Sequence, residues 1–183
     1  SVLRQEKTIP MRFATGQLKG TVYYQSYGTN LATNYCCHRD SSKNFGGATL
    51  AIKPGASVAT LVAGNNTYHS GCRVCHTVAS GGSRLITQLG ANYSGSDMYN
   101  LSNLVETPMY PQDGRFAWSA ISPDGSFLFS NSGWLSGASN LPSKLYEVPS
   151  GNPIATTGLP SDLGATTPAF SHDAKHVAFA WRG

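Results

Sequence analysis

One pattern recurs along the chain at intervals of 43 and 49 residues, and it constrains the fold more than any other feature. Each copy has a short apolar step, a polar turn of four residues, and then a run in which apolar residues alternate. The copies lie at residues 76–87, 119–130 and 168–179, and a weaker fourth one survives at 20–25. A structural unit repeated at this period predicts an array of similar units packed side by side.

The turn Ser122-Pro123-Asp124-Gly125 shows why the chain reverses direction in these copies. Proline fixes φ at about −65°, as the turn requires, and glycine tolerates a positive φ. In the run that follows, Phe127 and Phe129 fall on one face and Leu128 on the other, as in a strand. Each copy is therefore predicted to be a β-hairpin.

Two further strand candidates follow each hairpin, at residues 48–52 and 58–62, 97–101 and 105–109, and 144–148 and 153–157. Four strands in about 45 residues is the period of a β-propeller blade. No stretch of ten or more residues has helical periodicity. The sequence therefore predicts an all-β fold of four-stranded, β-propeller-like blades.

The predicted organisation is a single β-propeller domain or a fragment of one. Its blade-like units lie roughly at residues 15–64, 72–110, 115–160 and 166–183, which is about three and a half blades. Closed propellers have about four to eight blades, and an open one exposes unpaired strand edges. We therefore expect further blades or another subunit to complete the ring.

The turn at 122–125, its alternating strand and the later Leu145-Tyr146-Glu147-Val148 run resemble the repeat of TolB-like and other WD-type propellers. Residues 76–82 are similar to the same repeat with Cys-x-x-Cys-His fused to its front. This combination resembles exported bacterial propeller proteins that carry one c-type haem motif. The turns at 80–82 and 172–174 lack the Pro-Asp-Gly core. The resemblance therefore rests on the regular spacing of the repeats more than on any single turn.

Cys72, Cys75 and His76 have the Cys-x-x-Cys-His spacing that attaches a c-type haem. Two thiols three positions apart can form thioethers with the haem vinyl groups, and the adjacent imidazole can bind the iron. We therefore expect Cys72 and Cys75 to hold haem c covalently, with His76 as the proximal iron ligand. His38 and Met98 are the candidates for the distal ligand.

Other interpretations of the four cysteines remain open. Cys72 and Cys75 can form a disulfide, or they can join Cys36 and Cys37 in a zinc or copper site. If haem takes Cys72 and Cys75, then Cys36 and Cys37 are left to form a vicinal disulfide. Alternatively, each of these two can pair with a cysteine at 72 or 75 and tie the insertion that contains them to the next blade.

Composition narrows the class of protein. The net charge is +4, but the basic residues are scattered without a run, so no nucleic-acid partner is expected. No window approaches the ~18 apolar residues of a membrane span. Four cysteines in a polar chain with only 12% charged residues favour an oxidising compartment. The predicted location is periplasmic, extracellular or at the bacterial cell surface.

Together these patterns predict an exported propeller that bears a c-type haem and transfers electrons to or from a redox partner protein. The alternative is a disulfide-stabilised extracellular propeller that acts as a binding or structural scaffold without haem. No Ser/His/Asp arrangement, acid pair or phosphate loop stands out, so the sequence leaves open whether the protein is an enzyme.

Overall fold

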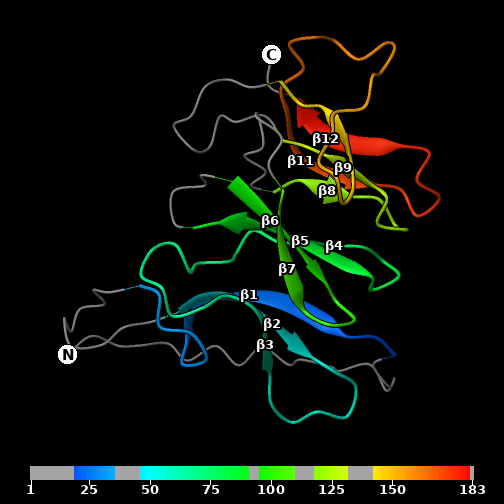
Figure 1. The fold of residues 1–183 in the computed structure, drawn as a ribbon. Coiled ribbons are helices and arrows are strands. Elements are labelled where there is room, and N and C mark those ends of the chain that lie inside the picture. The colour runs from blue at the N-terminus through cyan, green and yellow to red at the C-terminus, as the bar shows by residue number, and fades with distance from the viewer. Residues whose placement is uncertain (1–18, 36–45, 91–94, 110–117, 132–141, 182–183) are drawn as a thin grey trace, which may run out of the picture.

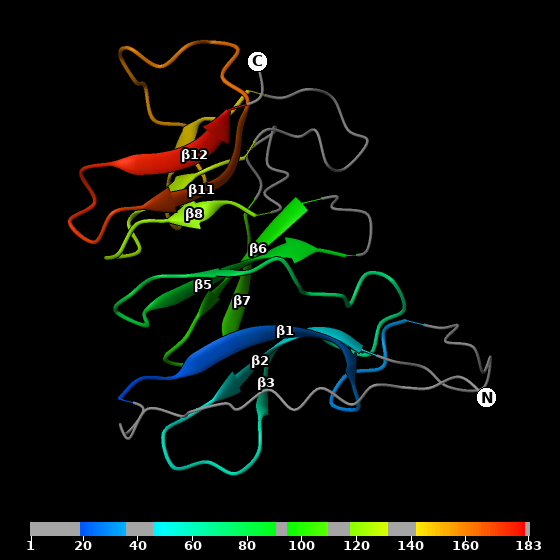
Figure 2. The ribbon, with the colours of Figure 1, turned by 180° about the vertical axis from the view of Figure 1, so that it is seen from behind.

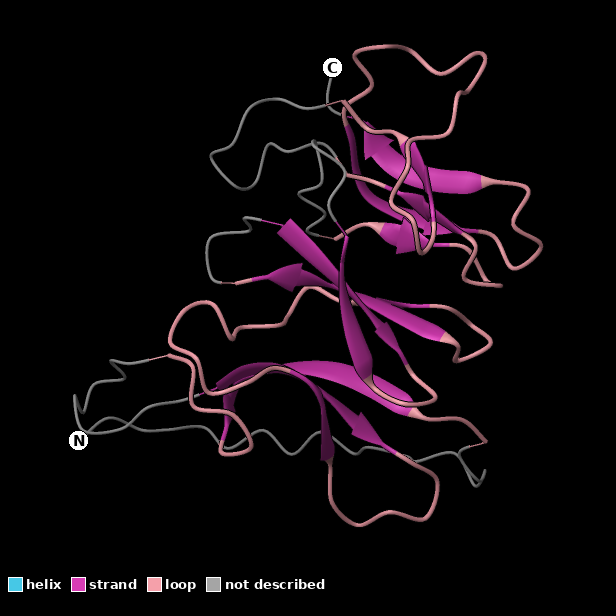
Figure 3. Cartoon of the chain, viewed as in Figure 1, coloured by secondary structure: helices cyan, strands magenta, loops and turns pink. Residues whose placement is uncertain are grey.

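The computed structural model describes residues 19–35, 46–90, 95–109, 118–131 and 142–181 of the chain, and all regular structure in these ranges is strand (Figure 3). The first sheet contains β1 (Val22–Thr29), β2 (Gly46–Ile52) and β3 (Thr60–Ala63). The second contains β4 (Thr77–Val78), β5 (Arg84–Leu89), β6 (Gly95–Asn100) and β7 (Val105–Met109). The third contains β8 (Ala120–Ile121), β9 (Phe127–Phe129) and β10 (Leu145–Glu147), and the fourth contains β11 (Ala165–Phe170) and β12 (Val177–Trp181).

Within each sheet, every strand pairs antiparallel with the next strand in the chain. The sheets follow one another in space in the order of the sequence, from β1–β3 at one end, through β4–β7, to β11 and β12 at the other (Figures 1 and 2). Strand β8 contacts both β4 and β11, so the first strands of the last three sheets are neighbours. This arrangement confirms the predicted all-β, blade-like fold. Within the described ranges, no helix has the length and apolar character needed to cross a membrane.

The three predicted hairpins close with the same hydrogen bond. At the start of each turn, an N–H donates to the carbonyl five residues later over 2.8–3.0 Å (Ala79 to Arg84, Ser122 to Phe127, Ser171 to His176). Three positions into each turn the backbone is left-handed, with φ of 68° at Gly82, 80° at Gly125 and 57° at Ala174. Glycine adopts this conformation freely, whereas alanine does so at a cost. The repeats are therefore equivalent in structure.

Serine and aspartate side chains reinforce two of these turns. The hydroxyl of Ser122 donates to Asp124 over 2.6 Å, and that of Ser171 donates to Asp173 over the same distance. Each serine oxygen also accepts the backbone N–H five residues later. Hydrogen bonds from Ser122 and Ser126 lower the pKa of Asp124 to about 2. Both aspartates thus bond within their own turns, as such residues commonly do.

Apolar clusters lie between successive sheets. Ala63 of the first sheet packs against Leu85 and Tyr99 of the second. Phe129 of the third sheet packs against Ala165 of the fourth. The cluster between the second and third sheets is the largest one in the described ranges and contains Ala79, Ile86, Met98, Met109, Ile121, Leu128, Tyr146 and Val148. Each sheet therefore depends on its neighbours to bury its apolar face.

The predicted strand at 153–157 is wrong. Only Pro153 forms a bridge there, opposite Tyr146, and the following N–H of Ile154 donates to the carbonyl of Leu145 over 2.8 Å. A proline has no N–H to give to a strand ladder. The outer edge of the third sheet is therefore reduced to this short contact.

The left-handed turn position leads to a stability test. Gly125→Ala should lower the free energy of unfolding by about 1–3 kcal/mol, because alanine is strained at this φ and its Cβ would lie 2.9 Å from Ser83 Oγ. Gly82→Ala is the matched control, because its Cβ would enter open space. Conversely, Ala174→Gly should raise stability by up to about 1 kcal/mol. Urea denaturation measures all three variants, and an equal loss for Gly125→Ala and Gly82→Ala would contradict the close approach.

Candidate functional site

The Cys-x-x-Cys segment lies between the first two sheets and bonds to both. The N–H of Arg73 donates to the carbonyl of Gly47 in β2 over 3.0 Å. The N–H of Gln88 in β5 donates to the carbonyl of Val74 over 3.0 Å. With bonds to a different sheet on either side, residues 72–75 act as a bridge between two blades.

Both cysteines of this segment are buried, free thiols. Cys72 is 0% exposed and Cys75 is 3% exposed. The Cys72 sulfur packs so closely against β2 that a Cβ added at Gly47 would lie 2.7 Å from it. Burial raises the pKa of both thiols, that of Cys75 to about 11. They are therefore protonated and poorly reactive at neutral pH.

The backbone of Cys75 has a conformation set by the repeat. Its φ is 54°, and the equivalent residues of the next two repeats, Trp118 and Thr167, have φ of 55° and 44°. The N–H of Cys75 donates to the side-chain oxygen of Gln25 in β1 over 2.7 Å. The kink before the first strand of the blade therefore recurs where there is no cysteine, so it belongs to the fold.

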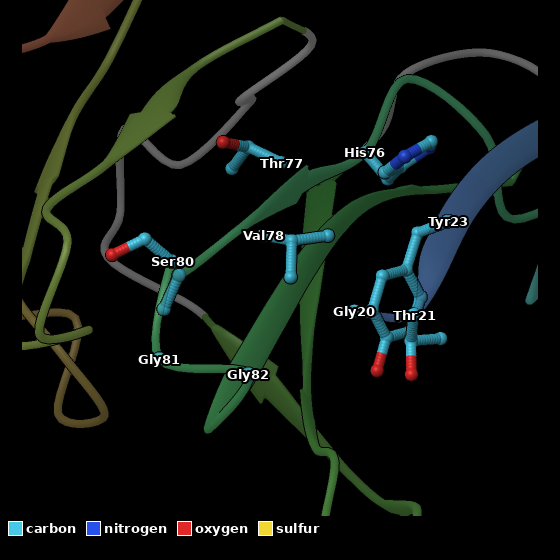
Figure 4. A pocket seen from close by; sticks show the side chains of 10 residues that line it. Gly20, Thr21, Tyr23, His76, Thr77, Val78, Ser80, Gly81 and Gly82 are labelled. Carbon is cyan, nitrogen blue, oxygen red and sulfur yellow. The ribbon is translucent and has the colours of Figure 1, made fainter. Parts of the chain in front are cut away.

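The residues as placed do not fit a covalent haem. Thioether formation needs both sulfurs accessible at one edge of the porphyrin, with the imidazole turned to its iron. Here Cys72 and Cys75 are enclosed by protein, and neither lines the cavity next to His76. The His76 ring lies next to Tyr23 and β1 (Figure 4). The two cysteines do not form a disulfide with each other either.

The other predicted ligands do not complete a haem site in the described structure. Met98 packs in the apolar cluster between the second and third sheets, apart from the cluster that contains Cys72 and Cys75. Cys36, Cys37 and His38 lie outside the described residues. Within the described ranges, no three His, Cys, Asp or Glu side chains gather in a way that could hold a metal ion.

An ionic cluster at Arg73, an unassigned position of the motif, was not predicted. The guanidinium lies 2.8 Å from Asp97 (Nε to Oδ2) and 2.7 Å from Glu106 (Nη2 to Oε1). It also donates to the carbonyl of Ser70 over 2.6 Å. Arg73 and Asp97 are almost completely buried, whereas Glu106 is about one-third exposed. Arg73 thus anchors the bridging segment to β6 and β7.

The charge balance of this cluster favours one retained proton. One guanidinium faces two carboxylates, so full ionisation would leave a net negative charge in a buried site. Burial raises the pKa of Asp97 to about 7, and the hydrogen bond to Glu106 adds to this effect. Hydrogen bonds from Asp97, Tyr99 and Arg73 hold the pKa of Glu106 below its ordinary value in spite of its partial burial. Of the two carboxylates, Asp97 therefore keeps its proton to the higher pH.

A cavity of about 710 Å³ opens beside the motif, between the first and second sheets. One wall is the beginning of β1 with Gly20, Thr21 and Tyr23, and the other is the segment 76–82, which comprises β4 and its turn (Figure 4). Among the described residues that line it, none is Lys, Arg, Asp or Glu. The cavity therefore suits an uncharged polar ligand.

His76 is the titratable histidine of this cavity. Its ring lies next to β1 and Tyr23, whereas Thr77 points to the opposite side of β4 (Figure 4). Burial lowers the pKa of His76, although its hydrogen bond to the Tyr23 backbone opposes that effect. The Nδ1 atom is buried without a partner, and in the neutral ring it can accept a hydrogen bond.

Comparison with known proteins identifies the type of fold. No family model and no curated protein matches the sequence. The structure of TolB from Agrobacterium tumefaciens is similar, with a TM-score of 0.52 and 16% identity over 75% of this chain and 46% of that one. The fold is that of a TolB-like β-propeller.

A second TolB structure, from Acinetobacter baumannii, has a TM-score of 0.47 and 15% identity over 72% of this chain and 31% of that one. The chain thus spans less than half the length of either solved TolB structure.

The proton on Asp97 should make stability depend on pH. The folded pKa of about 7 lies above the unfolded value of about 3.9, so the contribution of this group is fully present below about pH 4. As the pH rises from about 4 to about 7, the free energy of unfolding falls by on the order of 1–3 kcal/mol. Asp97→Asn should therefore match the wild type near pH 5 and exceed it at pH 8.

Denaturant unfolding of wild type and Asp97→Asn at a series of pH values measures this difference directly. Asp162→Asn is the control, because that carboxylate is exposed on the surface. A constant difference between wild type and Asp97→Asn from pH 5 to pH 8 would contradict a shared proton.

Proposed function

We propose that this protein is an exported, haem-free propeller that binds an uncharged polar partner in the cavity between its first two blades. The observation that carries the proposal is the separation of the motif's functional groups. The two sulfurs are enclosed between the sheets, whereas His76 turns to a cavity of about 710 Å³. A volume in this range is typical of ligand sites.

The chemistry of the cavity supports binding more than catalysis. Its polar groups are the hydroxyls of Thr21, Tyr23 and Ser80, the neutral imidazole of His76 and exposed backbone at the glycines. A neutral imidazole and hydroxyls provide donors and acceptors that orient a ligand. Among the described lining residues there is no cysteine, carboxylate or amine, so the nucleophilic groups in the same cavity as His76 are hydroxyls.

The proposal also includes a periplasmic location for the protein and further blades or another subunit next to the fourth sheet. The likeness to TolB supports a bacterial periplasmic location, although it does so through the fold alone. Further blades or another subunit would cover the fourth sheet, where Phe179 and Trp181 of β12 are 38% and 70% exposed. Large apolar side chains exposed together in this way commonly mark an interaction surface.

The absence of haem can be tested by expression in the periplasm of cells that mature c-type cytochromes. We expect a colourless, folded protein that gives no pyridine haemochrome spectrum. Alkylation under native conditions should leave Cys72 and Cys75 unmodified, and unfolding should expose both as free thiols. Trypsin cuts after Arg73, so peptide mass analysis reports each cysteine separately. A covalent haemochrome would overturn the haem-free proposal.

Partner binding in the cavity can be tested with a photo-crosslinking residue. Placed at Thr21, which lines the cavity, it should capture one defined partner in the native periplasm. The matched control is the same residue at Lys53, in the exposed turn after β2. Filling the cavity with Ser80→Trp should reduce capture at least severalfold without lowering the unfolding midpoint. Equal capture from Lys53, or none from Thr21, would contradict the cavity as the binding site.

A further inference from the structure

The turn between β6 and β7 carries Asn100-Leu101-Ser102, an Asn-x-Ser triplet outside the cavity and outside the bridging segment. Asn100 ends β6, and residues 101–104 form the turn. The five residues of β6 before Asn100 are buried, whereas Asn100 and Ser102 are exposed. In an exported protein, an Asn-x-Ser or Asn-x-Thr triplet on the surface can accept an N-linked glycan. The fold presents this triplet at the tip of a hairpin.

Two hydrogen bonds fix the side chain of Asn100. Its Oδ1 accepts the backbone N–H of Ser102 over 3.0 Å and the Oγ–H of Ser102 over 2.7 Å. A carboxamide oxygen has two lone pairs, so both are used. Among the described residues, none accepts a hydrogen bond from the Nδ2 of Asn100. The oxygen of this exposed carboxamide is therefore held by its own turn, and its nitrogen is left free to react.

The rest of the turn is attached to the blade. The N–H of Leu101 donates to the carbonyl of Ser83 over 3.0 Å, and its side chain packs into the cluster around Leu85. The N–H of Leu104 donates to the carbonyl of Asn100 over 2.7 Å. The residue between Asn and Ser thus points to the core, while the two residues beside it stay on the surface.

A second triplet of the described ranges, residues 65–67, is more enclosed. The N–H of Thr67 donates to Asn65 Oδ1 over 2.8 Å, but within the described structure the Thr67 hydroxyl does not. The N–H of Asn65 donates to the carbonyl of Gly71, and its carbonyl accepts from Asn34 Nδ2, each over 3.1 Å. A Cβ added at Gly71 would collide with Asn65 Oδ1. This compact loop leaves the Asn65 carboxamide less room than the hairpin tip leaves Asn100.

We propose that Asn100 accepts an N-linked glycan from a polyprenyl-pyrophosphate-linked oligosaccharide, transferred by an oligosaccharyltransferase. The bond from Nδ2 to the sugar C1 forms as the bond from C1 to the pyrophosphate oxygen breaks. One Nδ2 proton passes to a base of the transferase, and the polyprenyl pyrophosphate leaves with the electron pair of the broken bond, so nothing is oxidised or reduced. The inference rests on the exported location in the proposed function, because such transferases act on exported chains.

The acceptor lies beside the cavity and not in it. Ser83, which binds the turn, follows Gly82 of the cavity wall. Asn100 is not among the described residues that line the cavity. A glycan on Asn100 would therefore extend from the hairpin tip next to the cavity without filling it.

The test is glycosylation of the purified, folded full chain by a single-subunit oligosaccharyltransferase that accepts Asn-x-Ser/Thr, with its own lipid-linked oligosaccharide. We expect a glycan at Asn100 and much less at Asn65. Enzymatic release of the glycan in heavy-oxygen water converts the modified asparagine to labelled aspartate. Fragmentation of the tryptic peptide 85–115 then assigns the label within it. Absence of a glycan at Asn100 would overturn the proposal.

Matched variants test the geometry of the turn. Ser102→Ala removes the Oγ–H donor and should abolish modification of Asn100, whereas Ser102→Thr keeps the hydroxyl and should preserve it. Asn65→Gln should leave modification of Asn100 unchanged. Unfolding midpoints show whether each variant folds. Unchanged modification in Ser102→Ala would contradict the role of the hydroxyl and with it the assigned acceptor.

Capped peptides that copy residues 62–68 and 97–103 separate local sequence from fold. Both should be modified, because the contacts that enclose Asn65 exist only in the folded chain. Failure of the 97–103 peptide, or stronger modification of Asn65 than of Asn100 in the folded chain, would overturn the inference.

These outcomes are independent of the proposed function. The assay uses purified protein, so its result does not depend on the cavity ligand or on the location of the protein. Loss of modification at Asn100 would leave cavity binding in place, and failure of crosslinking at Thr21 would leave the acceptor in place.

Discussion

The structure depends on the contact between successive antiparallel sheets. A sheet of two to four short strands cannot remove both of its faces from water, so each must bury one against the next. Tyr99 and Leu85 meet Ala63 across the first contact, and Ala165 meets Phe129 across the last. The hairpins enforce this stacking, because a left-handed residue at the same turn position gives each pair of strands the same reversal. Equivalent hairpins then place the first strands of neighbouring blades side by side.

The Cys-x-x-Cys-His segment has to be understood within that stacking. Cys72 packs against Gly47 of β2, Cys75 lies in the same apolar cluster, and the Arg73 side chain reaches Asp97 and Glu106. The thiols therefore contribute packing, and the arginine contributes a buried electrostatic anchor. A spacing that suits haem attachment equally suits a short irregular segment with two buried sulfurs. The two roles differ in how deeply the sulfurs are buried, and a five-residue pattern does not encode burial.

His76 stands at the boundary between this packed bridge and the cavity. The N–H of the preceding residue, Cys75, donates to the side chain of Gln25, and the His76 ring lies next to Tyr23 (Figure 4). The Nδ1 atom of His76 is buried without a hydrogen-bond partner. His76 therefore joins the packed segment to the wall of the cavity.

The sequence by itself determined the all-β class, the hairpin repeats and the residues that share a turn position, because turn chemistry and alternation are local properties. It placed 105–109 as a strand with the observed bounds, and it failed at 153–157, where Pro153 interrupts the ladder. Tertiary structure alone decided the site. The pairing of Arg73 with Asp97 joins residues 24 positions apart, and the cavity joins Tyr23 to the turn at 80–82. These contacts arise only when two blades meet, so burial and the retained proton cannot be read from local pattern.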